Sequence, residues 1–379
     1  MASLGSLAPL SAIYSINCYK PCIGTTGFSL GKLKHCHKRK SNQRCIRAIY
    51  DGKNQHFQIA KEETTEEVSQ AMLVWRAIKL PIYSVALVPL TVASAAAYLH
   101  TGNFSARGYF GVLASSIFII AWLNLSNDVY DFDTGADKNK KESVVNMVGS
   151  RTGTLVAANL LLALGSVGLT VIAVEAGTFR SMLLLASAIF CGYVYQCPPA
   201  RLSYHGLGEP LCFAAFGPFA TTAFYLMQSS QRNLYPLHSV MGTIVSASIL
   251  VGYTTSLILF CSHFHQVEGD VAVGKISPLV RIGTETGSEV VKISVAILYL
   301  LLFAFGLGGT LPLVDIVFCG LTLPMGYMVT NYVKQNYNDK NKIFMSKYLC
   351  IRLHTLFGLA LAAGLVVARR LSIHPRPVL

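Results

Sequence analysis

Long apolar stretches recur along the chain from residue 80 to residue 368, and each is about as long as a bilayer is thick. A helix that crosses the hydrocarbon core needs roughly 20 mostly apolar residues. The predicted spans are 80–99, 107–126, 153–175, 181–197, 211–228, 238–260, 290–309, 311–330 and 349–368. Charged residues make up 13% of the chain, against ~25% in a typical soluble domain. The sequence therefore predicts an all-α integral membrane protein with about nine transmembrane helices.

Every charged residue among the first 50 is basic, and these residues lie among repeated Ser, Gly and Cys. This composition is typical of an organellar transit peptide, and a Ser-rich start without Arg before Arg39 favours the chloroplast. A disordered basic arm is the alternative. We predict a transit peptide and arm over 1–55, with cleavage between Cys45 and Gln55. The excess of basic residues is largest in this arm and in short loops, so no nucleic-acid partner is expected.

The segment 56–79 begins acidic and continues with spaced apolar residues, among them Met72, Trp75 and Ile78. Such an amphipathic segment is expected to lie along the membrane surface. The multi-span domain then covers 80–379. Most Lys and Arg residues of its short loops fall on the side shared with the N-terminus, which the positive-inside rule places in the stroma of a chloroplast.

An acidic cluster over 127–137 follows the second predicted span directly. If the helix continues through it, Asn127 and Asp131 lie one turn apart on one face. Gly135 then permits a sharp turn that brings Asp137 back toward Asp131. Oxygen ligands so placed suit Mg²⁺, which takes one or two carboxylates, several waters and a substrate phosphate. A solvated loop with neighbouring lysines as partners is the alternative.

A second polar cluster follows the sixth span. Glu268 and Asp270 offer further oxygen ligands, while Lys275 and Arg281 offer positive charge for a phosphate. Two such clusters on one membrane face indicate a substrate with several negative oxygens, and a diphosphate fits.

Two histidines precede these carboxylates, and a third polar set follows the fourth span. His263 and His265 could be neutral helix-end residues, or they could position or deprotonate a phenolic acceptor. The third set contains Tyr193 and Tyr195 and continues through 198–209, where Pro and Gly could simply end helices. Before the first span, Arg76 and Lys79 are either interfacial anchors or ligands of a phosphate.

The pattern Asn127-x-x-x-Asp131-x-x-x-Gly135-x-Asp137 resembles the first motif of the UbiA-type membrane aromatic prenyltransferases, in the branch that makes menaquinone and phylloquinone. The cluster ending in Asp270, followed by Gly274-Lys275 and Val280-Arg281-Ile282-Gly283, is similar to the second motif of that branch and its downstream signature. Arg76-x-x-Lys79-Leu80-Pro81 also matches the branch. Two departures are Gln266, where Asp is common, and His265, where Arg is frequent.

The resemblance implies nine helices around a central cavity open to lipid, with both motifs facing each other above it. It also implies transfer of a phytyl or other prenyl group from its diphosphate to 1,4-dihydroxy-2-naphthoate, with loss of CO₂ and diphosphate and with Mg²⁺ as cofactor. That reaction is a step of phylloquinone (vitamin K1) synthesis. Homogentisate or chlorophyllide is the alternative acceptor, and a cation-coupled transporter is the alternative class of protein.

Roles follow for the residues of these clusters. The catalytic candidates are Asp128, Asp131, His263 and His265. The candidates for diphosphate binding are Arg76, Lys79, Asn127, Lys275 and Arg281. The candidate metal ligands are Asp131, Asp137, Glu268 and Asp270.

Overall fold

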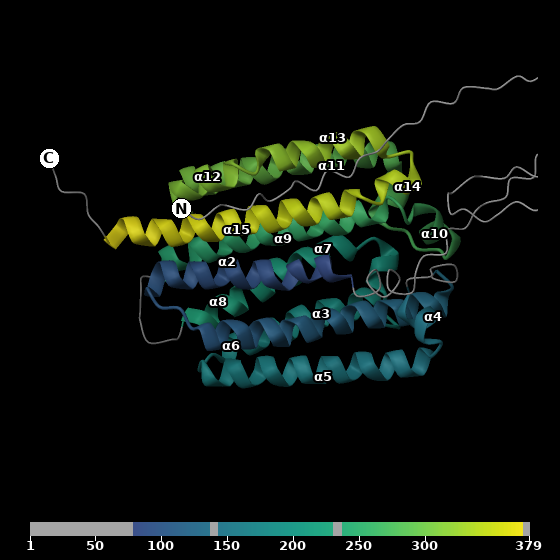
Figure 1. Ribbon diagram of the computed structural model, residues 1–379, viewed down its shortest axis with the longest axis horizontal. Helices are drawn as coiled ribbons and strands as arrows, with labels where there is room; N and C mark the ends of the chain where they lie inside the picture. The colour runs from purple at the N-terminus through teal and green to yellow at the C-terminus, as the bar shows by residue number, and fades with distance from the viewer. Residues whose placement is uncertain (1–78, 137–142, 230–236, 374–379) are drawn as a thin grey trace, which may run out of the picture. The chain divides into compact units, whose positions relative to one another are not determined.

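The computed structural model describes residues 79–136, 143–229 and 237–373, and every regular element among them is a helix (Figure 1). The predicted transit peptide over 1–55 and the predicted surface segment up to residue 78 lie outside the described residues, as do Arg76 and Asp137. Predictions about these parts stay predictions.

The helices follow one another with short connections. The first half contains the 3₁₀ helix η1 (Leu80–Tyr83), α2 (Ser84–Thr101), α3 (Ala106–Thr134), α4 (Val144–Val148), α5 (Arg151–Glu175), α6 (Phe179–Gln196), the 3₁₀ helix η2 (Leu202–His205), α7 (Gly208–Ala214), the π-helix η3 (Ala215–Thr221) and α8 (Thr222–Ser229). The second half contains α9 (Leu237–His263), α10 (Val267–Ala272), α11 (Pro278–Leu307), α12 (Leu313–Gly320), α13 (Leu323–Asn336), α14 (Lys340–Ile343) and α15 (Ser346–Ile373).

Helices lie at all the predicted spans, and most of them are long enough to cross a membrane. Among the described residues, seven helices are long and apolar enough to do so, and α12 with α13 makes an eighth if the pair, bent by 48°, counts as one span. The predicted span 181–197 corresponds to α6, which is outside this set because Arg180 and Gln196 at its ends lower its hydropathy. The all-α membrane architecture is confirmed, and the count of nine stays a prediction.

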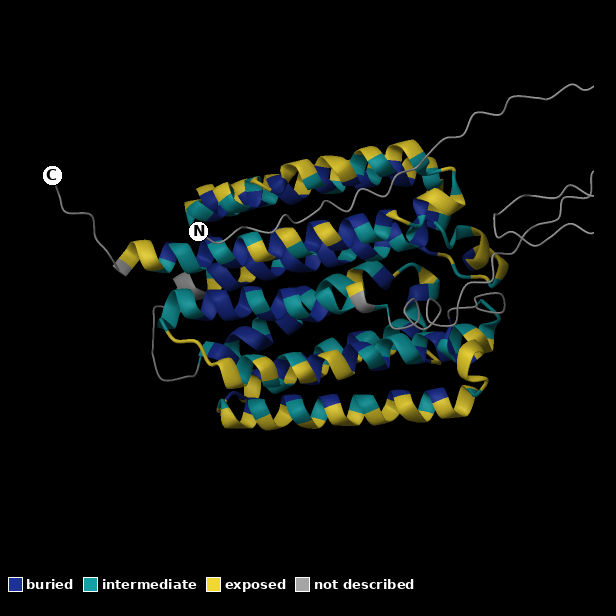
Figure 2. Cartoon of the chain, in the orientation of Figure 1, coloured by how far each residue is buried: buried dark blue, intermediate teal, exposed yellow. Residues whose placement is uncertain are grey.

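Burial separates the inner helices from the outer ones. In α9, 72% of the apolar window is buried within the protein, whereas in α5 only 17% is buried (Figure 2). Leu160, Leu164 and Val167 of α5 are all more than half exposed. In a chain of this hydropathy such apolar surface faces lipid, so α5 is a lipid-exposed helix held chiefly by its long contact with α3.

The segment from α7 to α8 lies unusually close to α9. A Cβ atom on Gly217 would lie 2.6 Å from the carbonyl oxygen of Ser248, and one on Gly252 would lie 2.7 Å from that of Phe213. Glycine at both positions therefore lets the two backbones touch, as small residues do between membrane helices. Pro218, which has no N–H to donate, lies within the π-helical turn at this contact. The close approach sets the position of α7 beside the last turns of α9.

Gly217→Ala should lower the thermal stability of the protein, because the added methyl group meets backbone atoms that cannot rotate away. We expect a loss of about 1–3 kcal/mol, typical of overpacking, measured as a lower melting temperature in detergent. Gly320→Ala is the matched control, since no atom lies within 4 Å of its added Cβ. Equal melting temperatures for the two variants would contradict this account of the contact.

Candidate functional site

Helix α3 continues through the first acidic cluster and ends at Gly135 with a φ of 81°, which meets the condition for Asn127 and Asp131 to share one face. Left-handed backbone of this kind is the usual way for glycine to end a helix. Within the cluster the Nδ2 group of Asn127 donates to Oδ2 of Asp131 at 2.8 Å, one helical turn away. Asp131 is thereby held at the last turns of α3, where the apolar part of the helix has ended.

Asp128 joins three segments at the same end of the bundle. Its Oδ1 atom lies 2.9 Å from Nζ of Lys79, and its Oδ2 accepts from the backbone N–H of Val144 at 3.1 Å. Asp128 is 1% exposed, and such a buried carboxylate is stable only beside a cation and donors. These contacts tie the residue before η1 and the start of α4 to α3. They also place the predicted diphosphate ligand Lys79 next to the first cluster.

The second cluster is divided between a buried and an exposed carboxylate. Oδ1 of Asp270 lies 3.2 Å from Nζ of Lys275, while its Oδ2 is buried and has no hydrogen-bond partner among the described residues. Glu268 is instead 77% exposed and pairs with Lys340 of α14. Arg281, in the first turn of α11, donates to the backbone carbonyl of His205 at 2.7 Å. Of this cluster, Asp270 and Lys275 form the part that faces inward.

Tyr204 of η2 connects the two clusters. Its hydroxyl lies 3.0 Å from the hydroxyl of Thr134 at the end of α3, and its carbonyl accepts from the N–H of Ile276 at 2.9 Å. Burial raises the pKa of the Tyr204 hydroxyl, and the carboxylates of Asp131 and Asp270 act in the same direction. The phenol is therefore protonated at neutral pH and lies within electrostatic range of both clusters.

Arg201 lies beside the same tyrosine in a strained backbone conformation. Its φ is 40°, a left-handed value that is uncommon for a residue other than glycine. Its guanidinium carbon lies 6.0 Å from the ring centre of Tyr130 and 5.9 Å from that of Tyr204. Neither Arg201 nor Tyr204 is among the predicted site residues. The sequence indicates a third polar set in this loop but also allows Pro and Gly simply to end helices there, and it singles out neither residue.

The two predicted histidines point to different neighbours. Nδ1 of His263 lies 3.0 Å from Oε1 of Glu209, in the first turn of α7, and His263 is 2% exposed. The ring of His265 packs edge-on against Phe344, with ring centres 4.9 Å apart. Tyr195, near the end of α6, lies within electrostatic range of Glu209 and of both clusters. His263 thus contacts Glu209 of α7, whereas the ring of His265 packs against Phe344, just before the start of α15.

The carboxylates of the two clusters can hold a metal ion only if a bound ligand supplies further oxygen atoms. Within residues 79–136, 143–229 and 237–373, no three His, Cys, Asp or Glu side chains converge to hold a metal. Asp131, Glu268 and Asp270 therefore do not form a complete protein site, and Asp137 lies outside the described residues. The unpartnered buried Oδ2 of Asp270 is nevertheless a free anionic oxygen. Because Mg²⁺ is commonly held by one or two carboxylates, waters and phosphate oxygens, these residues fit an ion that binds together with a phosphate ester.

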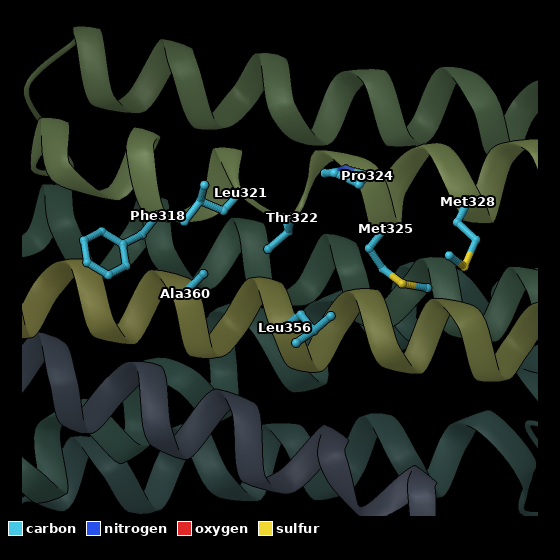
Figure 3. A pocket seen from close by; sticks show the side chains of 8 residues that line it. All are labelled: Phe318, Leu321, Thr322, Pro324, Met325, Met328, Leu356 and Ala360. Atoms are coloured by element: carbon cyan, nitrogen blue, oxygen red, sulfur yellow. The ribbon is translucent and has the colours of Figure 1, made fainter. Parts of the chain in front are cut away.

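Two apolar cavities lie away from the clusters. One, of about 480 Å³, lies where α12 bends into α13 over α15 and is lined by Phe318, Leu321, Thr322, Pro324, Met325, Met328, Leu356 and Ala360 (Figure 3). The other, of about 460 Å³, lies between α3, α5 and α6 and includes Trp122 and Tyr193. Neither lining includes a carboxylate of the clusters, so the central cavity open to lipid stays a prediction.

The structure is a bundle of membrane-length helices with two acidic and basic clusters that both lie beside Tyr204, as expected of a membrane-embedded transferase. The model of the UbiA prenyltransferase family matches residues 86–367. The chain belongs to this family and is a prenyltransferase, which sets the transporter alternative aside.

The names of similar proteins indicate which kind of prenyltransferase this chain resembles. The chain is 64% identical, over 310 residues, to the chloroplastic 2-carboxy-1,4-naphthoquinone phytyltransferase of Arabidopsis thaliana, covering 82% of this chain and 81% of the relative. It is 42% identical over 288 residues to the Synechocystis enzyme of the same name, covering 76% and 91%. It is also 23% identical over 310 residues to the 1,4-dihydroxy-2-naphthoate octaprenyltransferase of Bacillus subtilis, covering 80% and 95%.

Solved structures show the same fold. A UbiA homolog from Archaeoglobus fulgidus bound to GPP and Mg²⁺ superposes with a TM-score of 0.53 at 20% identity, covering 77% of this chain and 99% of that one. A homolog from Aeropyrum pernix gives a TM-score of 0.58 at 16% identity, covering 76% and 98%.

Asp128→Leu should destabilise the protein by about 3 kcal/mol, because it leaves the Lys79 ammonium partly buried without its anion. The double variant Lys79→Met/Asp128→Leu should recover most of that loss, since an apolar pair can replace a buried ion pair. Melting temperatures in detergent measure both effects. Lys340→Met, which breaks the exposed pair with Glu268, serves as the control and should change stability by less than about 1 kcal/mol. A double variant no more stable than Asp128→Leu would contradict the account.

Proposed function

We propose that this protein transfers a phytyl group from phytyl diphosphate to 1,4-dihydroxy-2-naphthoate, releasing CO₂ and diphosphate, in the synthesis of phylloquinone. The observation that carries the proposal is the 64% identity to the Arabidopsis phytyltransferase over most of both chains. The arrangement of the site supports it, because two carboxylate clusters, each with its own lysine, lie on either side of Tyr204.

The proposed location is a chloroplast membrane. The name of the Arabidopsis relative and the basic, Ser-rich N-terminal arm support the organelle. The distribution of Lys and Arg in the loops supports an orientation with the clusters and the mature N-terminus toward the stroma. The substrate favours such a site, because each buried CH₂ of the phytyl chain gains about 0.8 kcal/mol on leaving water, so the tail partitions into lipid.

The diphosphate is bound by the basic residues beside the carboxylates. The contacts of Lys79 with Asp128 and of Lys275 with Asp270 support this role for the two lysines. The other proposed diphosphate ligands are Arg76, Asn127 and Arg281. A magnesium ion bound with the diphosphate would be held by Asp131 and Asp270, with Asp137 and Glu268 as further predicted ligands, and would neutralise charge that builds up on the leaving group.

Positive charge develops on the allylic carbon as its bond to the diphosphate oxygen lengthens. The faces of aromatic rings stabilise such a cation through their quadrupole. Tyr195, Tyr204 and Tyr130 lie around the clusters and are the proposed rings. The electron-rich acceptor then attacks through the ring carbon that bears its carboxylate, and loss of CO₂ restores the aromatic ring.

The oxidation state of the acceptor decides whether this attack can occur. The Arabidopsis relative is named for a carboxynaphthoquinone and the Bacillus relative for a dihydroxynaphthoate. Only the dihydroxy form has the electron-rich ring that attacks a cation. We therefore propose the reduced form as the acceptor that reacts.

The full chain, reconstituted in lipid with phytyl diphosphate, 1,4-dihydroxy-2-naphthoate and Mg²⁺, should form a decarboxylated phytyl naphthoquinol. Mass spectrometry of the lipid extract identifies it. No product should form when EDTA removes the metal. None should form either when 2-carboxy-1,4-naphthoquinone replaces the naphthoate as acceptor in the absence of a reductant. Product with homogentisate or chlorophyllide, and none with the naphthoate, would overturn the proposed acceptor.

Asp131→Ala should reduce turnover roughly 10²-fold or more, because it removes a charge that acts directly at the leaving group. The amount of folded protein should change little. Asp133→Asn is the matched control on the same helix, since its carboxylate accepts from Arg151 at 2.7 and 2.8 Å and is assigned no role in the proposed reaction. Normal turnover by purified Asp131→Ala would exclude a role for this residue in catalysis.

A further inference from the structure

The acceptor reaction requires one proton to be removed and later returned. When the ring carbon bonds to the prenyl carbon, the electron pair of the allylic C–O bond leaves with the diphosphate, and the hydroxyl beside the attacked carbon becomes a carbonyl by losing its proton. When the bond to the carboxylate carbon breaks, its electron pair returns to that carbonyl oxygen, which takes a proton back. The reaction is balanced without a net proton, so a single group can hold it.

The contact between α7 and α9 provides a group suited to this task. Glu209 is held against α9 at two points: its carbonyl accepts from the hydroxyl of Ser256 at 3.1 Å, and its Oε1 lies 3.0 Å from Nδ1 of His263. Ser256 and His263 are seven residues apart, which places them two turns apart on one face of the helix. The carboxylate is therefore fixed relative to the imidazole by the backbone as well as by the side chains.

The chemistry of the pair defines which nitrogen is basic. An imidazole that donates its Nδ1–H to a carboxylate has its lone pair on Nε2. Glu209 has no Lys or Arg partner within the described part of the chain, and its Oε2 is buried without a hydrogen bond there. Its negative charge is consequently available to stabilise an imidazolium, the state His263 reaches on taking a proton.

Tyr195 relates the pair to the proposed reaction site. Tyr195 is within electrostatic range of Glu209, Asp131 and Asp270 together. Gly208, the residue before Glu209, lets this contact form, because a Cβ there would lie 3.0 Å from the ring of Tyr195. His263 is 2% exposed, so bulk water has little access to a proton held on it.

We propose that His263 takes the proton of the acceptor hydroxyl on Nε2 and returns it after CO₂ has left, and that Glu209 is the positioning residue that orients His263 and stabilises its charged form. The inference rests on the proposed function, since it concerns the acceptor half of that reaction.

Glu209→Gln keeps the shape of the side chain and removes its charge, and His263→Gln removes the base. We expect kcat to fall about 10–100-fold in Glu209→Gln and about 10²–10³-fold in His263→Gln. The KM for phytyl diphosphate should stay within about twofold, because the pair acts on the acceptor. Glu285→Gln is the matched control, since Glu285 is exposed, and it should turn over at the wild-type rate.

The deciding measurement compares acceptors whose hydroxyl groups differ in acidity, made by placing electron-withdrawing substituents on the far ring. A more acidic hydroxyl depends less on a base, so the defect of each variant relative to wild type should shrink along the series. The ratio of rates for two acceptors in one preparation does not depend on the folded fraction, so partial misfolding cannot mimic this result.

A defect of the same size for every acceptor would overturn the role of the pair, and so would a KM for the donor that rises in step with the loss of kcat. In either case, normal turnover by the wild-type protein would leave the proposed function intact. Absence of phytyl naphthoquinol from the wild-type protein itself would instead overturn the proposed function.

Discussion

A carboxylate at the edge of the hydrocarbon region is stable only with a cation or a hydrogen-bond donor beside it, and the architecture of this end of the bundle depends on that requirement. Asp128 binds Lys79 and the N–H of Val144, Asp270 binds Lys275, and Glu209 contacts His263. In the first and third of these sets the partners come from different helical segments. The contacts that stabilise these carboxylates therefore also fix how the ends of the helices meet.

The site is formed by segments that are far apart in the sequence and individually unremarkable. The last turns of α3, the short helix η2 and the loop after α10 meet at Tyr204, whose side chain contacts one segment and whose backbone contacts another. Helix α7 is brought to the same region because Gly217 and Gly252 let its continuation touch α9. A glycine contact within the bundle thus determines where Glu209 lies.

The apolar runs predict where the helices lie, because the thickness of a bilayer sets one length for all of them. They do not predict where helices end: α3 and α11 continue beyond the predicted spans into polar sequence, since hydropathy detects lipid contact and not backbone conformation. Contacts within one turn, such as Asn127 with Asp131, follow from helical spacing. Contacts between segments, such as Lys79 with Asp128, depend on packing that no local pattern records. The different neighbours of His263 and His265 have the same cause, because the contacts of each are set by other helices.

The pairing of the site lysines also has a consequence for the end of the catalytic cycle. In the proposed reaction, a diphosphate that binds to Lys79 or Lys275 displaces the carboxylate paired with that lysine. Its binding free energy is therefore the gain from the lysine–diphosphate contact minus the loss of the lysine–carboxylate contact. Once the reaction has left free diphosphate in the site, Asp128 and Asp270 are still adjacent and compete for the same ammonium groups. If diphosphate binds as proposed, these ion pairs compete with the product for the lysines, and the competition would limit how long the product stays bound.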